Sequence, residues 1–209
     1  MGEILEEVKV IVSKHPVFEI KYELLEDQVE ELRAVDTATF DKEWHQIYGP
    51  FTMIVDGHEF IPYPSPDMPL SAKDLYSELI LTNLDLLVDA CNYLNSHKYL
   101  ALKYVENCWT WLEIQVDDEV LILSELNDEI PYRYLIQTDK FLLIDAPYGS
   151  FSNIRVHKSE FINEIRTKII EFIKEIQAIN SELLKSVYFS KLLGFCDNHN
   201  KGDTTCYHH

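Results

Sequence analysis

Glycine is scarce in this sequence, and the few glycines present do not form a phosphate-binding loop. Only 6 of the 209 residues are glycine, and no two of them stand in a Gly-x-Gly or Walker-type arrangement. The zinc-protease, serine-hydrolase and kinase signatures are also missing. Because no known catalytic motif is present, we expect a protein that is not an enzyme and that holds no cofactor.

Basic residues are scarce too, and this shortage narrows the possible partners. Lys and Arg number 18 against 36 Asp and Glu, which gives a formal net charge of −18. Direct nucleic-acid binding and docking on an anionic membrane both need clustered cations, so neither is expected. The excess of acids instead predicts a basic protein partner, although acidity also serves solubility by itself.

Long apolar runs and a secretion signal are absent as well. Nothing approaches the ~20 apolar residues of a membrane span, and residues 1–7 lack the basic and apolar regions of a signal peptide. We therefore expect a soluble, cytoplasmic protein. Its four cysteines are expected to remain free thiols, because a chain of this length builds a core without disulfides. They are Cys91, Cys108, Cys196 and Cys206.

The apolar pattern predicts several strands. Residues 17–25 alternate in the manner of a half-buried strand, and Asp56-Gly57 is a dipeptide typical of a type I′ hairpin turn. Residues 4–12 fit a helix or a strand equally. Residues 99–102, 109–116 and 120–126 are predicted to form an antiparallel meander, with Asp117-Asp118-Glu119 as its last turn. Further strands are predicted over residues 51–55, 58–61, 132–136, 141–144 and 153–157.

Two long helices complete the predicted fold. Residues 71–95 and 159–187 carry apolar residues three or four apart, and the second helix has a possible break near Asn180-Ser181. Runs of strands separated by helices favour the α+β class, with a mostly antiparallel sheet packed against both helices. We expect one domain over residues 1–193 and a polar, disordered tail over residues 194–209.

The negative charge is concentrated in the first three quarters of the chain. Residues 154–209 hold 8 basic and 7 acidic residues, which leaves 10 basic and 29 acidic residues in the first 153. Two tryptophans two apart on one predicted strand are expected to share a face, either in the core or as exposed binding anchors. We predict a partner-binding face made of Trp109, Trp111, Asp117, Asp118, Glu119, Glu125, Asp128 and Glu129.

Three groups of residues are weaker candidates for chemistry. Glu113 and Glu125 stand on opposite arms of the predicted hairpin and are candidates for an acid–base pair. Cys108 with His97 is a candidate nucleophile and base. The tail offers ligand types that suit Zn²⁺, but the spacing matches no known zinc finger, and we expect no metal there. The tail candidates are Cys196, His199, Cys206 and His208.

Two segments carry a resemblance to a group of bacterial proteins. Residues 107–116 (NCWTWLEIQV), the acidic hairpin that follows, and residues 156–165 (VHKSEFINEI) resemble small acidic α+β proteins of Gram-positive bacteria. In these proteins a Trp-rich hairpin precedes a Phe-Ile-x-Glu-Ile helix, and some of them sit beside polymorphic toxin genes and look like immunity proteins. The resemblance covers residues 50–185. It implies a cytoplasmic bacterial protein that neutralises a toxin, and it transfers no functional residues.

We therefore predict an acidic protein-binding module, an inhibitor of the immunity or antitoxin type that occludes a basic toxin or nuclease surface. Two alternatives stay open. One is an enzyme of unrecognised class that uses carboxylates or a Cys/His metal site. The other is an oligomeric structural or regulatory module built on the last long helix. The sequence determines neither the oligomeric state nor the identity of the partner.

Overall fold

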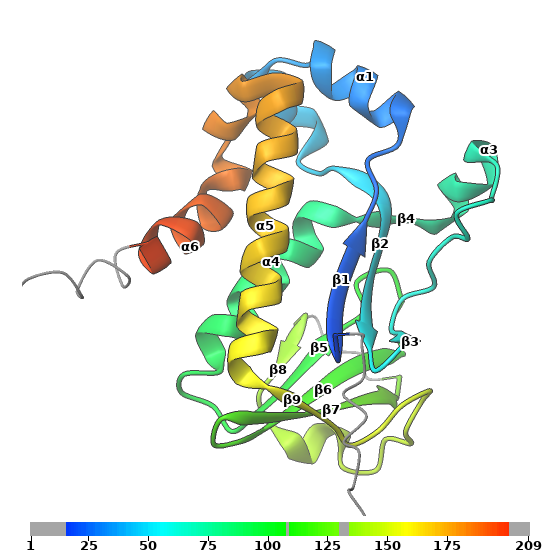
Figure 1. Ribbon diagram of the computed structural model, residues 1–209, viewed down its shortest axis with the longest axis vertical. Helices are drawn as coiled ribbons and strands as arrows, with labels where there is room; N and C mark the ends of the chain where they lie inside the picture. The colour runs from blue at the N-terminus through cyan, green and yellow to red at the C-terminus, as the bar shows by residue number, and fades with distance from the viewer. Residues whose placement is uncertain (1–15, 108, 130–133, 201–209) are drawn as a thin grey trace, which may run out of the picture.

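The computed structural model describes residues 16–107, 109–129 and 134–200, apart from the side chains of residues 198–200 (Figure 1). Within these ranges the chain forms two antiparallel sheets and several helices, which confirms the predicted α+β class. The ambiguous segment 4–12 lies outside the described residues. Across the described ranges, no helix has the length and apolar character needed to cross a membrane.

The first sheet is built around one long strand, β2 (Tyr48–Val55). β1 (Phe18–Tyr22) pairs with one edge of β2, and the short strands β3 (His58–Glu59) and β4 (Ser77–Leu79) pair with its two ends. Between β2 and β3, Asp56 and Gly57 have φ values of 49° and 82°, as a type I′ turn requires. The predicted first strand and the Asp-Gly hairpin are therefore confirmed.

The second sheet has five strands in the order β8-β5-β6-β7-β9. Its centre is the predicted meander, and β9 adds the predicted edge strand near residues 153–157. Asp118 has a φ of 53° in the tight turn between β6 and β7. The strands are β5 (Tyr99–Lys103), β6 (Thr110–Asp117), β7 (Val120–Asn127), β8 (Ile136–Gln137) and β9 (Ile154–His157).

One long helix, α5 (Lys158–Asn180), runs past both sheets (Figure 1). Its buried stripe repeats every three or four residues, from Phe161 through Phe172 to Ile176. The other helical elements are α1 (Glu26–Ala34), α2 (Thr37–Thr39), η1 (Phe40–Trp44), α3 (Leu70–Lys73), η2 (Asp74–Tyr76), α4 (Ile80–Tyr93), η3 (Lys140–Leu143), η4 (Ser181–Lys185), η5 (Val187–Phe189) and α6 (Ser190–Asn200).

Two predicted elements are wrong in part. The helix expected over residues 71–95 begins only at Ile80, because residues 77–79 pair with β2 as strand β4. Leu75, which the helical pattern placed on the buried face, is 86% exposed. The strand expected over residues 141–144 is the helical turn η3, whose start is capped when the Asp139 carboxylate accepts from the Phe141 N–H (2.9 Å).

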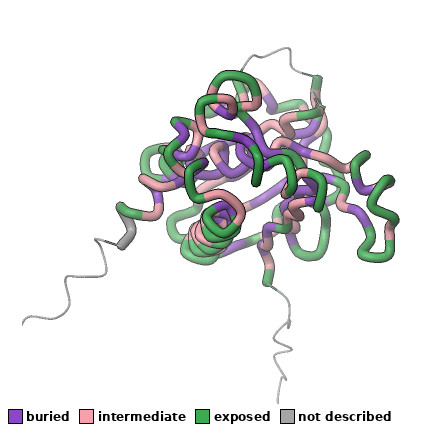
Figure 2. Tube along the Cα trace, turned by 90° about the horizontal axis from the view of Figure 1, so that it is seen from above, coloured by how far each residue is buried: buried purple, intermediate pink, exposed green. Residues whose placement is uncertain are grey.

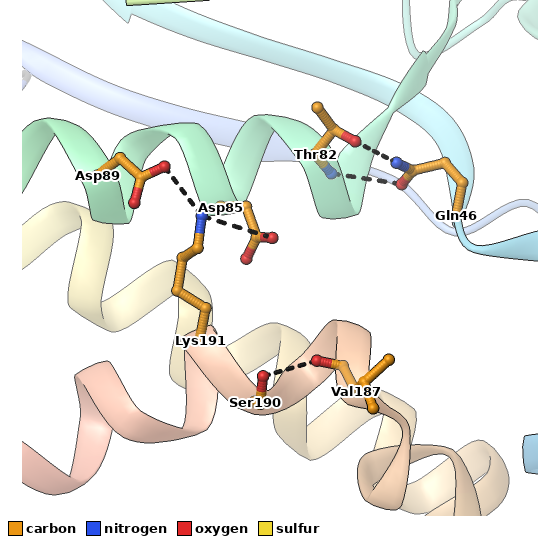
Figure 3. Close-up of polar contacts among 7 residues, drawn as sticks. All are labelled: Gln46, Thr82, Asp85, Asp89, Val187, Ser190 and Lys191. Carbon is orange, nitrogen blue, oxygen red and sulfur yellow. Dashed lines mark hydrogen bonds and ion pairs between the residues drawn. The ribbon is translucent and has the colours of Figure 1, made fainter. Parts of the chain in front are cut away.

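The tail expected from residue 194 is helical as far as residue 200. Leu192 and Phe195 of α6 are buried in the core. Lys191, also on α6, places its ammonium group near two carboxylates of α4, Asp89 at 2.9 Å and Asp85 at 3.9 Å (Figure 3). These contacts dock α6 on α4, so residues 194–200 belong to the folded body. Residues 201–209 lie outside the described part of the chain.

One apolar cluster joins the two sheets to α4, α5 and α6. Figure 2 shows the buried segments gathered in the interior, with exposed segments around them. A second, small cluster lies on the outer face of the five-stranded sheet, under η3. Its buried members are Tyr99, Ala101, Trp111, Leu126 and Leu143.

The first turn of α4 is capped by a side chain from far away in the sequence. Leu79, which precedes the helix, provides no side-chain cap. Instead the buried Gln46 side chain accepts a hydrogen bond from the N–H group of Leu81 (2.9 Å). It also accepts from the N–H group of Thr82 (3.4 Å) and donates to the Thr82 hydroxyl (Figure 3). Gln46 therefore satisfies helix-terminal donors that are otherwise buried without a partner.

Replacement of this cap is expected to destabilise the fold. Gln46→Ala should lower the free energy of unfolding by about 2 kcal/mol, because buried N–H groups lose their acceptor. Urea denaturation followed by circular dichroism measures the change. Gln177→Ala, at an exposed position on α5, is the control and should change stability by less than about 0.5 kcal/mol. Equal stability of the two variants would contradict the capping role.

Candidate protein-binding site

The acids predicted to form one binding face lie at the two ends of the β6–β7 hairpin. Asp117, Asp118 and Glu119 are exposed at the turn. Two of them already have cation partners, since Arg155 lies 3.2 Å from Asp117 and Lys98 lies 3.9 Å from Asp118. The turn is therefore partly neutralised.

The remaining predicted residues lie at the opposite end of the same hairpin. Asp128 donates its backbone N–H to the Trp109 carbonyl (2.7 Å), which places Glu129 near the same end. Eight-residue strands at ~3.3 Å per residue separate the two ends by about 23 Å. The structure thus brings Trp109 and Asp128 together, but not with the acids of the turn.

The two tryptophans have different environments. Trp109 precedes β6 and is 51% exposed, whereas Trp111 is 0% exposed beneath η3. The Trp111 indole N–H donates to the Asp128 carbonyl (3.2 Å), which satisfies its one polar group. The predicted role of Trp111 as a surface anchor is therefore wrong, because the segment after β8 folds back over this face of the sheet.

The candidate carboxylate pair is separated by the strand register. Glu113 lies opposite Ser124, and Glu125 lies opposite Leu112, so the two carboxylates point to opposite faces of the sheet. Glu113 is buried at 4% exposure. Glu125 accepts hydrogen bonds from the backbone N–H (3.0 Å) and the hydroxyl of Ser150, which hold the chain before β9. Glu113 and Glu125 therefore do not form an acid–base pair, and Glu125 is not a free acid for partner binding.

The cysteine and histidine candidates find no support as a site within the described part of the chain. No group of three or more His, Cys, Asp or Glu side chains there is arranged to hold a metal ion. Burial raises the pKa of Cys91 to about 12, and burial together with Asp197 raises the pKa of Cys196. Cys108, Cys206, His208 and the side chain of His199 lie outside the described residues.

A concentration of unpaired acids lies around α1 in the described part of the chain. Four neighbouring cavities of about 590, 390, 280 and 400 Å³ surround this helix and share lining residues, so that they form one hollow surface. We call this surface the α1 groove. Its charged lining consists of Glu23, Glu26, Asp27, Glu30, Glu31, Asp74, Glu171 and Glu175 against Lys21, Arg33 and Lys168.

Four acids of α1 have no ion-pair partner among the described residues. They are Glu26, Asp27, Glu30 and Glu31, and all four are exposed. Glu26 and Glu30, like Asp27 and Glu31, are four residues apart and repel each other on the helix surface. Glu30 and Glu31 also lie beyond the first turn, where the helix dipole no longer favours acids. Glu30 and Glu31 therefore cost helix stability.

The rest of the groove is more balanced and offers apolar contacts. The Lys73 ammonium is buried and reaches both Glu23 oxygens at 2.7 and 2.8 Å. This ion pair ties α3 to the chain after β1. Leu70 and Tyr48 also line the groove, and both are exposed large apolar side chains. The groove thus combines negative charge with apolar anchors.

One feature of the sequence, a segment rich in acids, points to this site, although the predicted binding face does not include it. Residues 26–46 are rich in acids, yet the spacing of like charges four apart is visible only once a helix is assigned there. The other walls of the groove come from residues 20–24, 48, 63–77 and 168–179. Only the fold brings these segments together.

Comparisons with known proteins give no relative from which a function is transferred. No protein-family model, no curated protein and no solved structure matches this chain. The candidate site is therefore argued from its own geometry and charge.

Proposed function

We propose that this protein is a protein-binding module that holds a basic partner in the α1 groove. In the form we favour, it is a cytoplasmic inhibitor of the immunity or antitoxin type, and its acidic surface covers a basic toxin surface such as a nuclease active site. The observation that carries the proposal is the charge of the groove, whose lining holds eight carboxylates and three cations.

The acids of α1 place uncompensated negative charge in a hollow surface. Acids that line a concave surface with low-dielectric walls focus the electric field and accelerate the approach of a cationic surface. Solubility alone does not require four unpaired acids on one nine-residue helix where they repel each other. Exposed Leu70 and Tyr48 provide apolar contacts that hold a partner after charge has steered it.

Co-expression with basic nuclease toxins, and with any toxin that a neighbouring gene encodes, tests the proposal. The wild-type protein is expected to rescue growth when it is co-expressed with one of them. The triple variant Glu26→Lys, Glu30→Lys, Glu31→Lys should lose rescue, and its association rate at low salt should fall about 10- to 100-fold. Surface plasmon resonance at several salt concentrations measures the rate, and circular dichroism confirms that α1 stays folded.

A matched control uses the hairpin turn. Asp117→Lys, Asp118→Lys, Glu119→Lys makes the same change in charge, but two of these acids are already paired. We expect the association rate of this variant to fall less than about 3-fold. Equal loss in both variants would remove the α1 groove as the binding face, and failure of the wild-type protein to rescue or bind would remove the inhibitor function.

A further inference from the structure

The largest cavity of the α1 groove lies between β1 and α5. Its volume is about 590 Å³, within the range of roughly 300–1,000 Å³ typical of ligand pockets. In Figure 1 α5 runs alongside β1, and α1 lies beyond the upper end of the strand. Leu24, Val29, Ala178 and Ile179 form apolar walls, so an alkyl chain is well accommodated.

The charges around this cavity are paired, with one exception. Lys168 lies 2.8 Å from Glu171, Lys21 lies 3.6 Å from Glu19, and Glu23 is held by the Lys73 ammonium. In the described part of the chain, Glu175 has no such ion pair. Partial desolvation raises the pKa of this carboxyl group, and the Tyr22 hydroxyl and the Lys168 ammonium oppose the rise only in part. A cation placed beside Glu175 supplies the counter-charge that this carboxylate lacks.

Two tyrosines complete the polar lining. The Tyr22 hydroxyl oxygen is buried, and it interacts with the Glu175 carboxylate. Burial raises the pKa of Tyr22, and the nearby Glu175 raises it further, so the hydroxyl stays protonated. Burial, Glu23 and Glu59 raise the pKa of Tyr63 to about 12. Tyrosine rings beside a carboxylate suit an ammonium or guanidinium group, through charge and through cation–π attraction.

We infer that the cavity between β1 and α5 receives a Lys or Arg side chain that the basic partner inserts, with its alkyl stem on the apolar walls and its cationic head beside Glu175 and Tyr22. The inference rests on the proposed function. An anion is disfavoured because the lysines at the cavity already pair with carboxylates, and the charge left without an ion pair is the negative charge of Glu175. A neutral apolar group would leave the Glu175 carboxylate without a counter-charge.

The pocket is tested without the partner, with small probes of the same chemistry. Titration of n-pentylammonium and of the peptide acetyl-Ala-Lys-Ala-amide, followed by amide NMR shifts, is expected to give saturable binding in the millimolar range, with shifts on β1 and α5. n-Pentanol and acetyl-Ala-Leu-Ala-amide should bind at least about 10-fold more weakly, because they lack the charge.

Variants of the lining locate the binding group. Glu175→Gln should weaken binding of both cationic probes at least about 10-fold, and Tyr22→Phe about 3-fold, since a charged acceptor contributes more than a neutral hydroxyl. Glu160→Gln makes the same charge change at an exposed position of α5 away from the cavity, and it should bind as the wild type does. The inference is overturned if the NMR shifts of the wild type do not saturate with the cationic probes, or if Glu175→Gln binds these probes as tightly as the wild type does.

Failure of the pocket and failure of the proposed function give different results. If the α1 triple variant loses the partner while the wild type binds neither cationic probe, the pocket inference alone is wrong. If both probes bind through Glu175 but none of the tested toxins is bound, the proposed function is wrong. The cavity is then a site for free organic cations rather than for a partner side chain, and the inference as stated also fails.

Discussion

Trp111→Ala is expected to lower the free energy of unfolding by about 4 kcal/mol, whereas Trp109→Ala should lower it by less than about 1 kcal/mol. The two indoles stand two residues apart, but Trp111 is fully buried in the second cluster and Trp109 is half exposed. Truncation of Trp111 leaves a cavity under η3 and removes the hydrogen bond to the Asp128 carbonyl. Chemical denaturation of both variants measures the difference.

The same pair of variants reports on the segment that covers the sheet. Leu142, Leu143 and Ala146 pack against the cluster that contains Trp111. Loss of this support should increase amide hydrogen exchange in residues 140–148 in Trp111→Ala but not in Trp109→Ala. Trp111→Phe is the control, because it keeps most of the buried apolar area and should recover at least half of the lost stability. Similar losses in both alanine variants would contradict the burial of Trp111.

Stability is expected to fall between about pH 4.5 and pH 7 because of Glu78. This side chain is 5% exposed, and burial raises its pKa from 4.5 to about 7, a rise that the hydrogen bond from the Tyr104 hydroxyl only partly opposes. The folded state therefore holds the proton more tightly than the unfolded state does. The contribution is fully present below about pH 4.5, is lost as pH rises through 7, and amounts to on the order of 3 kcal/mol.

Glu78→Gln isolates this contribution from the rest of the charge. Glutamine keeps an oxygen acceptor for Tyr104 and does not titrate, so the variant should be the more stable protein at pH 8. Burial also raises the pKa of Asp85, to about 6, and that group acts in the same direction at lower pH. The difference between wild type and Glu78→Gln, measured by urea denaturation from pH 4.5 to pH 8, cancels Asp85. A difference that is constant over this range would contradict the prediction.

The predicted site and the observed groove differ for a reason that lies in the fold. The acids after Trp109 are dense in the sequence, but an extended hairpin places Asp117 and Asp128 at opposite ends. The acids of α1 are equally dense, and a helix keeps them within one short surface. The number of acids per stretch of chain can be counted in the sequence. The distance between those acids in space depends on whether a helix or an extended hairpin carries them.

The sequence by itself determined the elements whose pattern is local. The left-handed turn at Asp56-Gly57, the meander from β5 to β7 and the buried stripe of α5 each follow from residues that are neighbours in the chain. Alternation, turn chemistry and helical spacing act over a few residues, so they are visible without any partner.

The tertiary structure decided what depends on contacts between distant segments. Residues 77–79 form strand β4 because they pair with an edge of β2. Helix α6 is held in place because its apolar face packs in the core and Lys191 forms an ion pair with α4. Trp111 was buried because η3 folds back over it. The α1 groove exists because α1, α3 and α5 meet around the chain that follows β1. These contacts join parts of the chain far apart in sequence, where no local pattern reports them.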